Sequence, residues 1–475
     1  MILKDILKDI KPRQIISSRG TPTVEIEFCL DGFSIFSSVP SGKSVGSLEA
    51  KIIVDNGDSY SGTSVSTVVN SIIQHKNILL ELEVSSPDIF DAFLITLDGT
   101  RDKSKLGTNF ILPLSICYRK LFAYINKEPL WAQFVKKRLN IMNMLSKESE
   151  ARAFQAGNQK LKKEKDQDML KQSSTDKIKT GSDFYCLNCN FDSQMEGNLT
   201  VRMPLAHFNV INGGLHSGNK LDCQEIMVCF EESTFRLQLE KSIQFYEALG
   251  KEITKNYNKI YTSVGDEGGY VPPIETLVEA LNLIVSTGEK IPNLKYKIAL
   301  DLAASSFHLE ENLYFFENKK ITGKELALYY EDLVVKYPIY SIEDPFDETD
   351  YDSWIYFYEK MNERINIVAD DLTVTNPELI EKLGKRGMFN TVLIKPNQIG
   401  SIMETVNAVD LCQKMGFKVM ISHRSSETED TFISDFAVGV GAEYIKSGAP
   451  SHGERICKYN ELLRIEESII DQFKL

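Results

Sequence analysis

Hydrophobic and polar positions alternate near the start of the chain. Between residues 13 and 39 the alternation is interrupted by an Asp31-Gly32 pair, which favours a tight turn between two strands. From about residue 62 to residue 125 the apolar residues recur at helical spacing instead. The pattern predicts antiparallel hairpins followed by helices, and therefore a small N-terminal α+β domain over residues 1–133.

After residue 200 short β-branched runs alternate with amphipathic segments of helix length, which is typical of parallel strands joined by helical crossovers. Each run ends in a polar residue. In a closed barrel such strand ends meet at one mouth, whereas an open sheet gathers its ligand contacts at one switch point. We therefore predict an α/β fold with a (β/α)8-type barrel over residues 199–475. The polar residues at the run ends are Asp301, Glu343, Asp370, Lys395, His423 and Lys446.

Residues 134–198 are rich in Lys, Gln, Ser, Glu and Asp and poor in large apolar residues. Such a segment buries little surface, so we predict a polar insertion or linker between the two domains, with a partner-binding arm as the alternative. Cys186 and Cys189 form a CxxC pair near its end. No second CxxC or nearby histidine pair completes a zinc site, so a structural zinc is not expected.

Composition narrows the functional classes. The 475 residues are 42% hydrophobic and 25% charged, as in globular proteins, and the net charge of -13 argues against nucleic acid or an anionic membrane as partner. The eight cysteines are scattered, which fits a reducing cytoplasm. The first residues lack the apolar core of a signal peptide, and no apolar run is long enough for a membrane span.

The strand-end carboxylates carry the first chemical hypothesis. Asp301, Glu343 and Asp370 would form an all-oxygen site suited to Mg²⁺, although acids at strand ends also cap helices. A neighbouring lysine, Lys395, could act as a general base if positive charge from the metal and Lys446 lowers its pKa. Abstraction of a proton next to a carboxylate would create an enediolate, whose charge divalent cations stabilise.

Longer segments closely resemble the enolase family. The resemblance covers nearly the whole chain except residues 134–198. The segments that carry it are SSRGTPTVE (17–25), PSGKSVG (40–46), LDGTRDKSKLGTN (97–109), FNVINGGLHSGN (208–219), QEIM (224–227), VGDEGG (264–269), SIEDPF (341–346), ADDLTVTN (369–376), IKPNQIG (394–400), SHRSSETEDTFISD (422–435), IKSGAP (445–450) and LLRIEE (462–467).

That resemblance implies reversible dehydration of 2-phosphoglycerate to phosphoenolpyruvate, a step of glycolysis and gluconeogenesis, with two Mg²⁺ per active site. It implies that Asp301, Glu343 and Asp370 hold the first Mg²⁺. Ser44, in the loop 40–46, resembles the serine that binds the second Mg²⁺ when the loop closes over the site.

The other roles also follow from the resemblance, position by position. Lys395 would remove the C2 proton, while Glu225 and Glu267 look like the acid pair that assists departure of the C3 hydroxyl group. His423, like His216, is similar to the family's substrate-contacting histidines, and we count it with the catalytic residues. Arg424 and Ser425 would hold the phosphate and Lys446 the substrate carboxylate. The substrate-binding residues that the resemblance implies are His216, Gln224, Arg424, Ser425 and Lys446.

A homodimer is implied as well. Arg13 and Glu454, and likewise Glu25 and Arg464, match the positions of ion pairs that cross between subunits in the family. These pairs rest on the resemblance alone.

Several positions depart from the family pattern, mostly in the mobile loops. They bear on loop closure, on affinity for the second metal and on turnover more than on the type of reaction. The departures are Lys43 and Val45 for the usual Ala and Thr, Leu48 for a histidine, Ser426 for a glycine, Ser18 for an aspartate and Ser306 for a glutamate.

Three other interpretations remain at this point. One is a divergent homologue with reduced or no activity that serves a binding or scaffolding role. Another is a superfamily member that acts on a sugar acid. The third is a nucleotide site at Gly42-Lys43-Ser44, although Ser37 stands where a phosphate-binding P-loop requires glycine.

Overall fold

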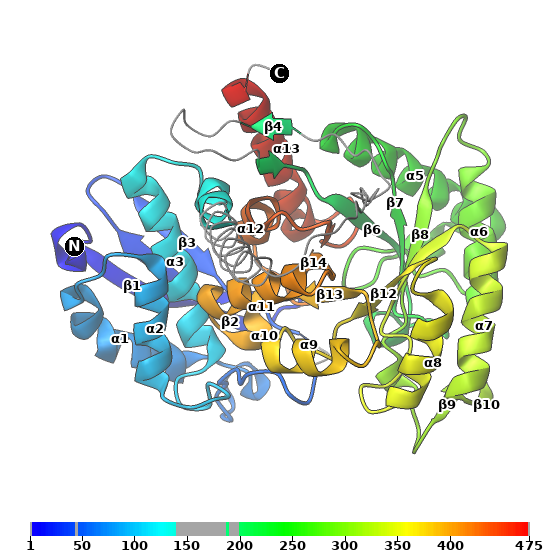
Figure 1. The fold of residues 1–475 in the computed structure, drawn as a ribbon, viewed down its shortest axis with the longest axis horizontal. Coiled ribbons are helices and arrows are strands. Elements are labelled where there is room, and N and C mark those ends of the chain that lie inside the picture. The colour runs from blue at the N-terminus through cyan, green and yellow to red at the C-terminus, as the bar shows by residue number, and fades with distance from the viewer. Residues whose placement is uncertain (1, 43–45, 139–186, 190–198, 474–475) are drawn as a thin grey trace, which may run out of the picture.

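The computed structural model describes residues 2–42, 46–138, 187–189 and 199–473 (Figure 1). The chain begins with a three-stranded antiparallel sheet of order β1-β2-β3, against which α1 and α3 pack. This confirms the hairpins and the helices that the sequence predicts. The elements of this part are η1 (Leu3–Asp5), β1 (Asp9–Ile16), β2 (Pro22–Cys29), β3 (Ser34–Ser38), η2 (Ser59–Gly62), α1 (Ser66–Glu81), α2 (Pro87–Asp98) and α3 (Thr108–Asn126).

The bounds of α2 follow from its sequence. Ser86 accepts a hydrogen bond from the backbone N–H of Ile89, and Pro87 occupies the first turn, where its missing N–H has no helical partner. Gly99 ends the helix with a φ of 71°, a left-handed conformation that glycine adopts without steric cost.

Eight strands close a barrel in the order β6-β7-β8-β11-β12-β13-β14-β15. The closed barrel confirms the predicted fold class, and all six predicted run ends lie at or directly after the ends of barrel strands. The barrel strands are β6 (Leu205–Asn212), β7 (Glu225–Cys229), β8 (Lys297–Asp301), β11 (Ile339–Glu343), β12 (Asn366–Ala369), β13 (Thr391–Ile394), β14 (Lys418–Ser422) and β15 (Tyr444–Lys446).

One strand differs from a uniform parallel barrel. β7 runs antiparallel to both β6 and β8. The connection 213–224 between β6 and β7 contains only a short 3-10 helix, too little for the helical crossover that a parallel pair requires, so the chain must run back. The reversal places Glu225, the first residue of β7, at the same rim as the carboxyl ends of the other strands, opposite Asp301 in the register.

Helices surround the barrel (Figure 1). Two of them, α6 and α7, begin with complete capping boxes, in which a threonine and a glutamate satisfy each other's backbone N–H groups. The helices are η4 (Gly214–His216), α5 (Phe235–Asn256), η5 (Lys259–Thr262), α6 (Leu277–Gly288), η6 (Ala304–Ser306), α7 (Gly323–Lys336), α8 (Tyr351–Met361), α9 (Pro377–Gly384), α10 (Pro396–Ile399), α11 (Ile402–Lys414), α12 (Phe432–Val440) and α13 (Gly453–Phe473).

Two short antiparallel pairs lie outside the barrel. One is a hairpin between β8 and α7, and the other links the residues on either side of 190–198. The described part of the chain contains no helix that is both long and apolar enough to cross a bilayer. The pairs are β9 (Leu313–Phe316) with β10 (Lys319–Thr322), and β4 (Leu187–Cys189) with β5 (Leu199–Val201).

The N-terminal part packs against one side of the barrel. Helix α3 contacts α10 and α11, and α2 contacts α11 (Figure 1). One hydrophobic cluster includes buried residues of both parts. Residues 130–138 are helical, and within them Phe134 packs edge-on against Phe436 of α12. Packed structure therefore continues beyond residue 133. Most of the predicted insertion, 139–186 and 190–198, lies outside the described residues.

Candidate active site

The strand register explains why polar side chains meet at one rim of the barrel. Glu225, Asp301 and Glu343 lie side by side on the neighbouring strands β7, β8 and β11. The side chains that line a common pocket there include His216, Gln224, Glu225, Glu267, Asp301, Asp370, Lys395, His423, Arg424, Ser425 and Lys446.

Lys446 reaches across the mouth from β15. Its Nζ lies 2.8 Å from Asp301 Oδ2, 2.9 Å from Glu343 Oε2 and 2.9 Å from Glu225 Oε1, and all four side chains are buried. Burial disfavours the charged ammonium, but the three carboxylates outweigh it and hold the pKa of Lys446 well above its usual value. Lys446 is therefore a fixed positive charge at the centre of the rim.

Lys395 follows β13 and donates a hydrogen bond to Asp370. The expectation that Lys446 and a bound metal lower the pKa of Lys395 concerns the metal-loaded site; in the protein without metal the carboxylates prevail. Burial and the charge of Arg424 lower it, but Asp370, together with the more distant Glu343 and Asp371, raises the pKa of Lys395 above its usual value. The opposing positive charge comes from Arg424.

Asp301, Glu343 and Asp370 were expected to share one cation, and their donor atoms suit a hard divalent ion because all are carboxylate oxygens. Burial, with the charges of Asp301 and Asp370, raises the pKa of Glu343 well above its usual value, so the three form one electrostatic unit. The ammonium group of Lys446 donates hydrogen bonds to Asp301 and Glu343, and that of Lys395 donates one to Asp370. Among the described residues, the acid and histidine groups with ligand atoms within 4.8 Å of one another are His216, Glu225 and Glu267, and Asp344, Asp370 and Asp371.

Each of the three strand-end carboxylates is followed within four residues by a strained backbone position. Ala303, Asp344 and Val374 have φ values of 44°, 40° and 42°, which side chains other than glycine rarely adopt. The Asp344 carboxylate accepts hydrogen bonds of 2.9 Å from the backbone N–H groups of Asp370 and Asp371. The strained turn after β11 thus fixes the position of the loop after β12.

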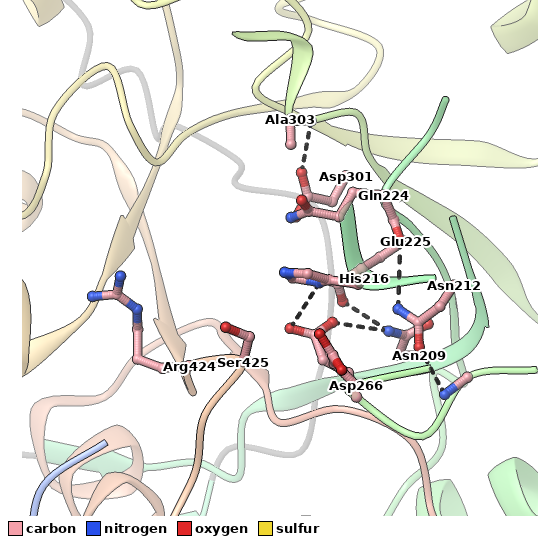
Figure 2. Close-up of polar contacts among 12 residues, drawn as sticks. Asn209, Asn212, His216, Gln224, Glu225, Asp266, Asp301, Ala303, Arg424 and Ser425 are labelled. Atoms are coloured by element: carbon pink, nitrogen blue, oxygen red, sulfur yellow. Dashed lines mark hydrogen bonds and ion pairs between the residues drawn. The ribbon is translucent and has the colours of Figure 1, made fainter. Parts of the chain in front are cut away.

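A second carboxylate pair is formed by Glu225 of β7 and Glu267 of the loop 263–270, and Figure 2 shows Glu225 beside Asn209 of β6. Asn209 Nδ2 donates hydrogen bonds of 3.1 Å to both Glu225 Oε2 and Glu267 Oε2. Burial and the charge of Glu267 raise the pKa of Glu225 well above its usual value. Burial would raise the pKa of Glu267 too, but interactions with His216, His423 and Lys446 hold it well below its usual value. The pair can therefore keep one proton on Glu225, an arrangement suited to acid–base chemistry.

His423 is held in one protonation form. Arg455 Nη1 lies 2.6 Å from His423 Nδ1, and because a guanidinium only donates, Nδ1 must accept. Burial and the charge of Arg455 lower the pKa of His423 well below its usual value, so the proton of the neutral ring sits on Nε2. That atom lies 3.7 Å from Glu267 Oε1. Within the described residues, His423 Nε2, His216 Nε2 and Gln224 Oε1 are buried without a hydrogen-bond partner, so each can contact a bound molecule.

Arg424 and Ser425 lie across the site from Glu225 and Asn209 (Figure 2). The Arg424 guanidinium pairs with both oxygens of Glu49 from the N-terminal part, at 3.0 and 3.1 Å, and donates to Asn397 Oδ1 at 3.0 Å. The barrel alone therefore does not complete this wall of the site.

Sequence reasoning missed several of these contributors, among them Asn209, Asn397 and Glu49. Asn209 and Asn397 lie in the family-like segments 208–219 and 394–400, where they could have been found as polar residues beside the predicted ones. Glu49 lies outside such a segment, and no motif near it in the sequence indicates a functional role. Ser44, the predicted ligand of a second metal, lies outside the described residues, as do Lys43 and Val45.

A closed barrel with a buried acid pair, two lysines and a cluster of carboxylates at its rim defines an acid–base barrel enzyme. Comparison with known sequences identifies the family. Residues 200–475 match the family described as "Enolase, C-terminal TIM barrel domain", and residues 7–134 match "Enolase, N-terminal domain". A protein of Methanopyrus kandleri named enolase is 37% identical over 472 residues, which cover 97% of this chain and 95% of that relative.

The chain belongs to the enolase family, which consists of metal-dependent hydro-lyases. The match spans both domains, so the barrel and the N-terminal part are both family features.

Proposed function

We propose that the protein catalyses the reversible dehydration of 2-phosphoglycerate to phosphoenolpyruvate and water. The observation that carries the proposal is the opposition of a lysine and an acid pair in one pocket. Lys395 lies after β13, whereas Glu225 and Glu267 belong to β7 and the loop 263–270 on the other side of the mouth. Elimination requires a base for the C2 proton and an acid for the C3 hydroxyl group, and this arrangement offers both.

In this proposal the bound cations would offset the carboxylates that raise the pKa of Lys395. Lys395 Nζ could then take the C2 proton, and Glu225 would deliver a proton to the departing hydroxyl group. The raised pKa of Glu225 supports its role as the acid. Glu267 and Asn209 hold Glu225 in place through the shared hydrogen bonds. His423 would present its Nε2 proton to the substrate, because this atom is buried and has no hydrogen-bond partner among the described residues.

Two Mg²⁺ are proposed as cofactors. Asp301, Glu343 and Asp370 would hold the first, and Ser44 would bind the second. The ions would supply positive charge that stabilises the enediolate formed when the C2 proton leaves. The all-oxygen donor set supports this choice of cation.

The remaining pocket residues would bind and orient the substrate. Arg424 and Ser425 would hold its phosphate, and the buried positive charge of Lys446 would face its carboxylate. His216 and Gln224 would use their unpartnered polar atoms for further contacts. A substrate phosphate would have to share Arg424 with Glu49.

Assembly, location and domain limits are proposed on the family relationship. A homodimer would pair Arg13 with Glu454 and Glu25 with Arg464 between subunits. Within this chain, Arg13 contacts Glu25 at 2.6 Å, so the dimer would add to an existing pair. We propose the cytoplasm as the location, glycolysis or gluconeogenesis as the pathway, and no nucleic-acid or membrane partner. The matched ranges 7–134 and 200–475 support domains 1–133 and 199–475 separated by the insertion 134–198.

The direct test is to follow phosphoenolpyruvate formation from 2-phosphoglycerate with added Mg²⁺, and again after chelation. We expect turnover only with the metal. The departures in the loop favour one competing function, a homologue with a binding role, since Leu48 is 62% exposed where the family has a histidine. Folded, Mg²⁺-supplied protein without turnover would favour that alternative.

A further inference from the structure

Three hydroxyl groups meet where the N-terminal part touches the barrel rim. Ser17 Oγ lies 2.7 Å from Ser426 Oγ and 2.8 Å from Thr21 Oγ1, and Thr21 Oγ1 lies 3.1 Å from Ser426 Oγ. Ser17 and Ser426 are buried. We refer to Ser17, Thr21 and Ser426 as the hydroxyl triad. Each member can donate one hydrogen bond and accept others, so the three can satisfy one another in a closed ring.

The hydroxyl triad lies at the centre of a larger set of contacts between the N-terminal part and the barrel rim, which we call the seam. Ser426 exchanges two backbone hydrogen bonds with Ser41, of 2.9 and 3.0 Å, directly before the loop residues 43–45. Ser18 donates its N–H to Glu427 O at 2.8 Å, and Ser18 Oγ accepts the N–H of Glu427 at 3.0 Å. The turn between β1 and β2, the start of the 40–46 loop and the rim segment after β14 are therefore joined at Ser426.

The same rim segment is held from the barrel side by Arg455 of α13. Its Nη1 donates to Arg424 O at 2.7 Å, and its Nη2 donates to Ser425 O at 2.8 Å. Arg455 is fully buried. The backbone of Arg424 and Ser425, the proposed phosphate-binding residues, is thus held by Arg455 of α13, and the next residue, Ser426, is held by the hydroxyl triad.

Two of the departures from the family pattern, Ser18 and Ser426, lie in this seam. A glycine at position 426 would have no hydroxyl group to offer Ser17 and Thr21. The triad is therefore a feature of this chain's own sequence, and its members act on the reaction only through neighbouring residues.

We propose that the hydroxyl triad positions the rim segment 424–427 and the start of the 40–46 loop so that the rim segment can bind the substrate phosphate. This inference rests on the proposed roles of Arg424 and Ser425. Loss of one hydroxyl group would loosen the segment that binds the phosphate while leaving Lys395 and Glu225 in place. The effect should then appear in substrate affinity and not in the rate of the chemical step.

The test uses matched substitutions at Thr21 in the full-length protein. Thr21→Val keeps the shape and removes the hydroxyl group, whereas Thr21→Ser keeps the hydroxyl group. We expect Thr21→Val to raise KM for 2-phosphoglycerate about five-fold, the equivalent of one hydrogen bond, with kcat within about two-fold. Thr21→Ser should have the same KM as the wild type. Ser64→Ala is the control, because Ser64 is a buried hydroxyl of the same part that bonds Gln14 and Ser66 instead.

A second substitution guards against a variant that fails to fold. Ser426→Gly should raise KM in the same way, and combining it with Thr21→Val should add little, because both remove the same ring of hydrogen bonds. An unchanged KM in folded Thr21→Val and Ser426→Gly, with an active wild type, would overturn the positioning role alone. A wild type that neither turns over 2-phosphoglycerate nor binds phosphoenolpyruvate with Mg²⁺ would overturn the proposed function and this inference with it.

Discussion

The buried pair of Glu49 and Arg424 gives the sharpest prediction about how the two parts of the chain depend on each other. Both side chains are almost completely buried, with 2% and 3% of their surface exposed. Glu49→Ala removes both carboxylate oxygens that face the guanidinium, and it also removes the acceptor for the backbone N–H of Gly46. A buried cation that loses its partner typically costs about 3–5 kcal/mol.

We therefore expect Glu49→Ala to lower the free energy of unfolding by about 3–5 kcal/mol, measured by urea titration without added metal. The matched control is Glu381→Ala, which breaks an exposed pair with Lys385 whose side chains are 52% and 65% exposed. That change should stay within about 0.5 kcal/mol.

A double variant separates the charge effect from general damage. Arg424→Met in the Glu49→Ala background removes the buried cation that has lost its carboxylate at position 49, so part of the lost stability should return. A loss of less than about 1 kcal/mol in Glu49→Ala would show that the buried pair does not hold the two parts together in this way. A double variant less stable than Glu49→Ala alone would equally refute the charge effect.

Three further changes test other parts of the structure. Burial raises the pKa of Asp435 from 3.8 to about 7, so the wild type should lose stability as the pH rises from about 4 to about 7. Thermal unfolding at each pH should show Asp435→Asn to be more stable than the wild type by up to a few kcal/mol above about pH 7, and no more stable below about pH 4. A Cβ on Gly46 would lie 2.6 Å from Val374 Cγ1, so Gly46→Ala should destabilise the protein by about 1–3 kcal/mol in urea; an unchanged midpoint would contradict this close approach. Asn209→Ala removes the donor shared by the acid pair and should lower kcat at least about ten-fold, and a steady-state kcat equal to that of the wild type would refute its proposed role.

The sequence predicted the barrel well because strand ends and helices leave a strong periodic pattern. Asp301, Glu343 and Lys446 were expected at one rim, and the register brings them there. The direction of β7 was not predicted, since a short apolar run carries no sign of its orientation. It followed only from the shortness of the connection 213–224.

The residues of the site could be predicted from the sequence, but their pKa shifts and their contacts with the other domain could not. Lys395 was expected to have a pKa lowered by Lys446 and the metal, and the sequence did not reveal that Asp370, which lies 25 positions earlier, raises it in the protein without metal. Glu49 comes from the other domain and is 375 positions away from Arg424. Such contacts depend on how the two domains pack against each other, and the spacing of residues within a short segment does not predict this packing.

The proposed function depends above all on Lys395 removing the C2 proton while Glu225 supplies the proton for the leaving hydroxyl group. The most direct measurement is exchange of the C2 hydrogen of 2-phosphoglycerate with deuterated solvent, followed by NMR with Mg²⁺ present. We predict that Lys395→Ala abolishes this exchange, whereas Glu225→Gln retains part of it although phosphoenolpyruvate formation falls. Equal loss of exchange in both folded variants, or exchange that persists in Lys395→Ala, would contradict these roles.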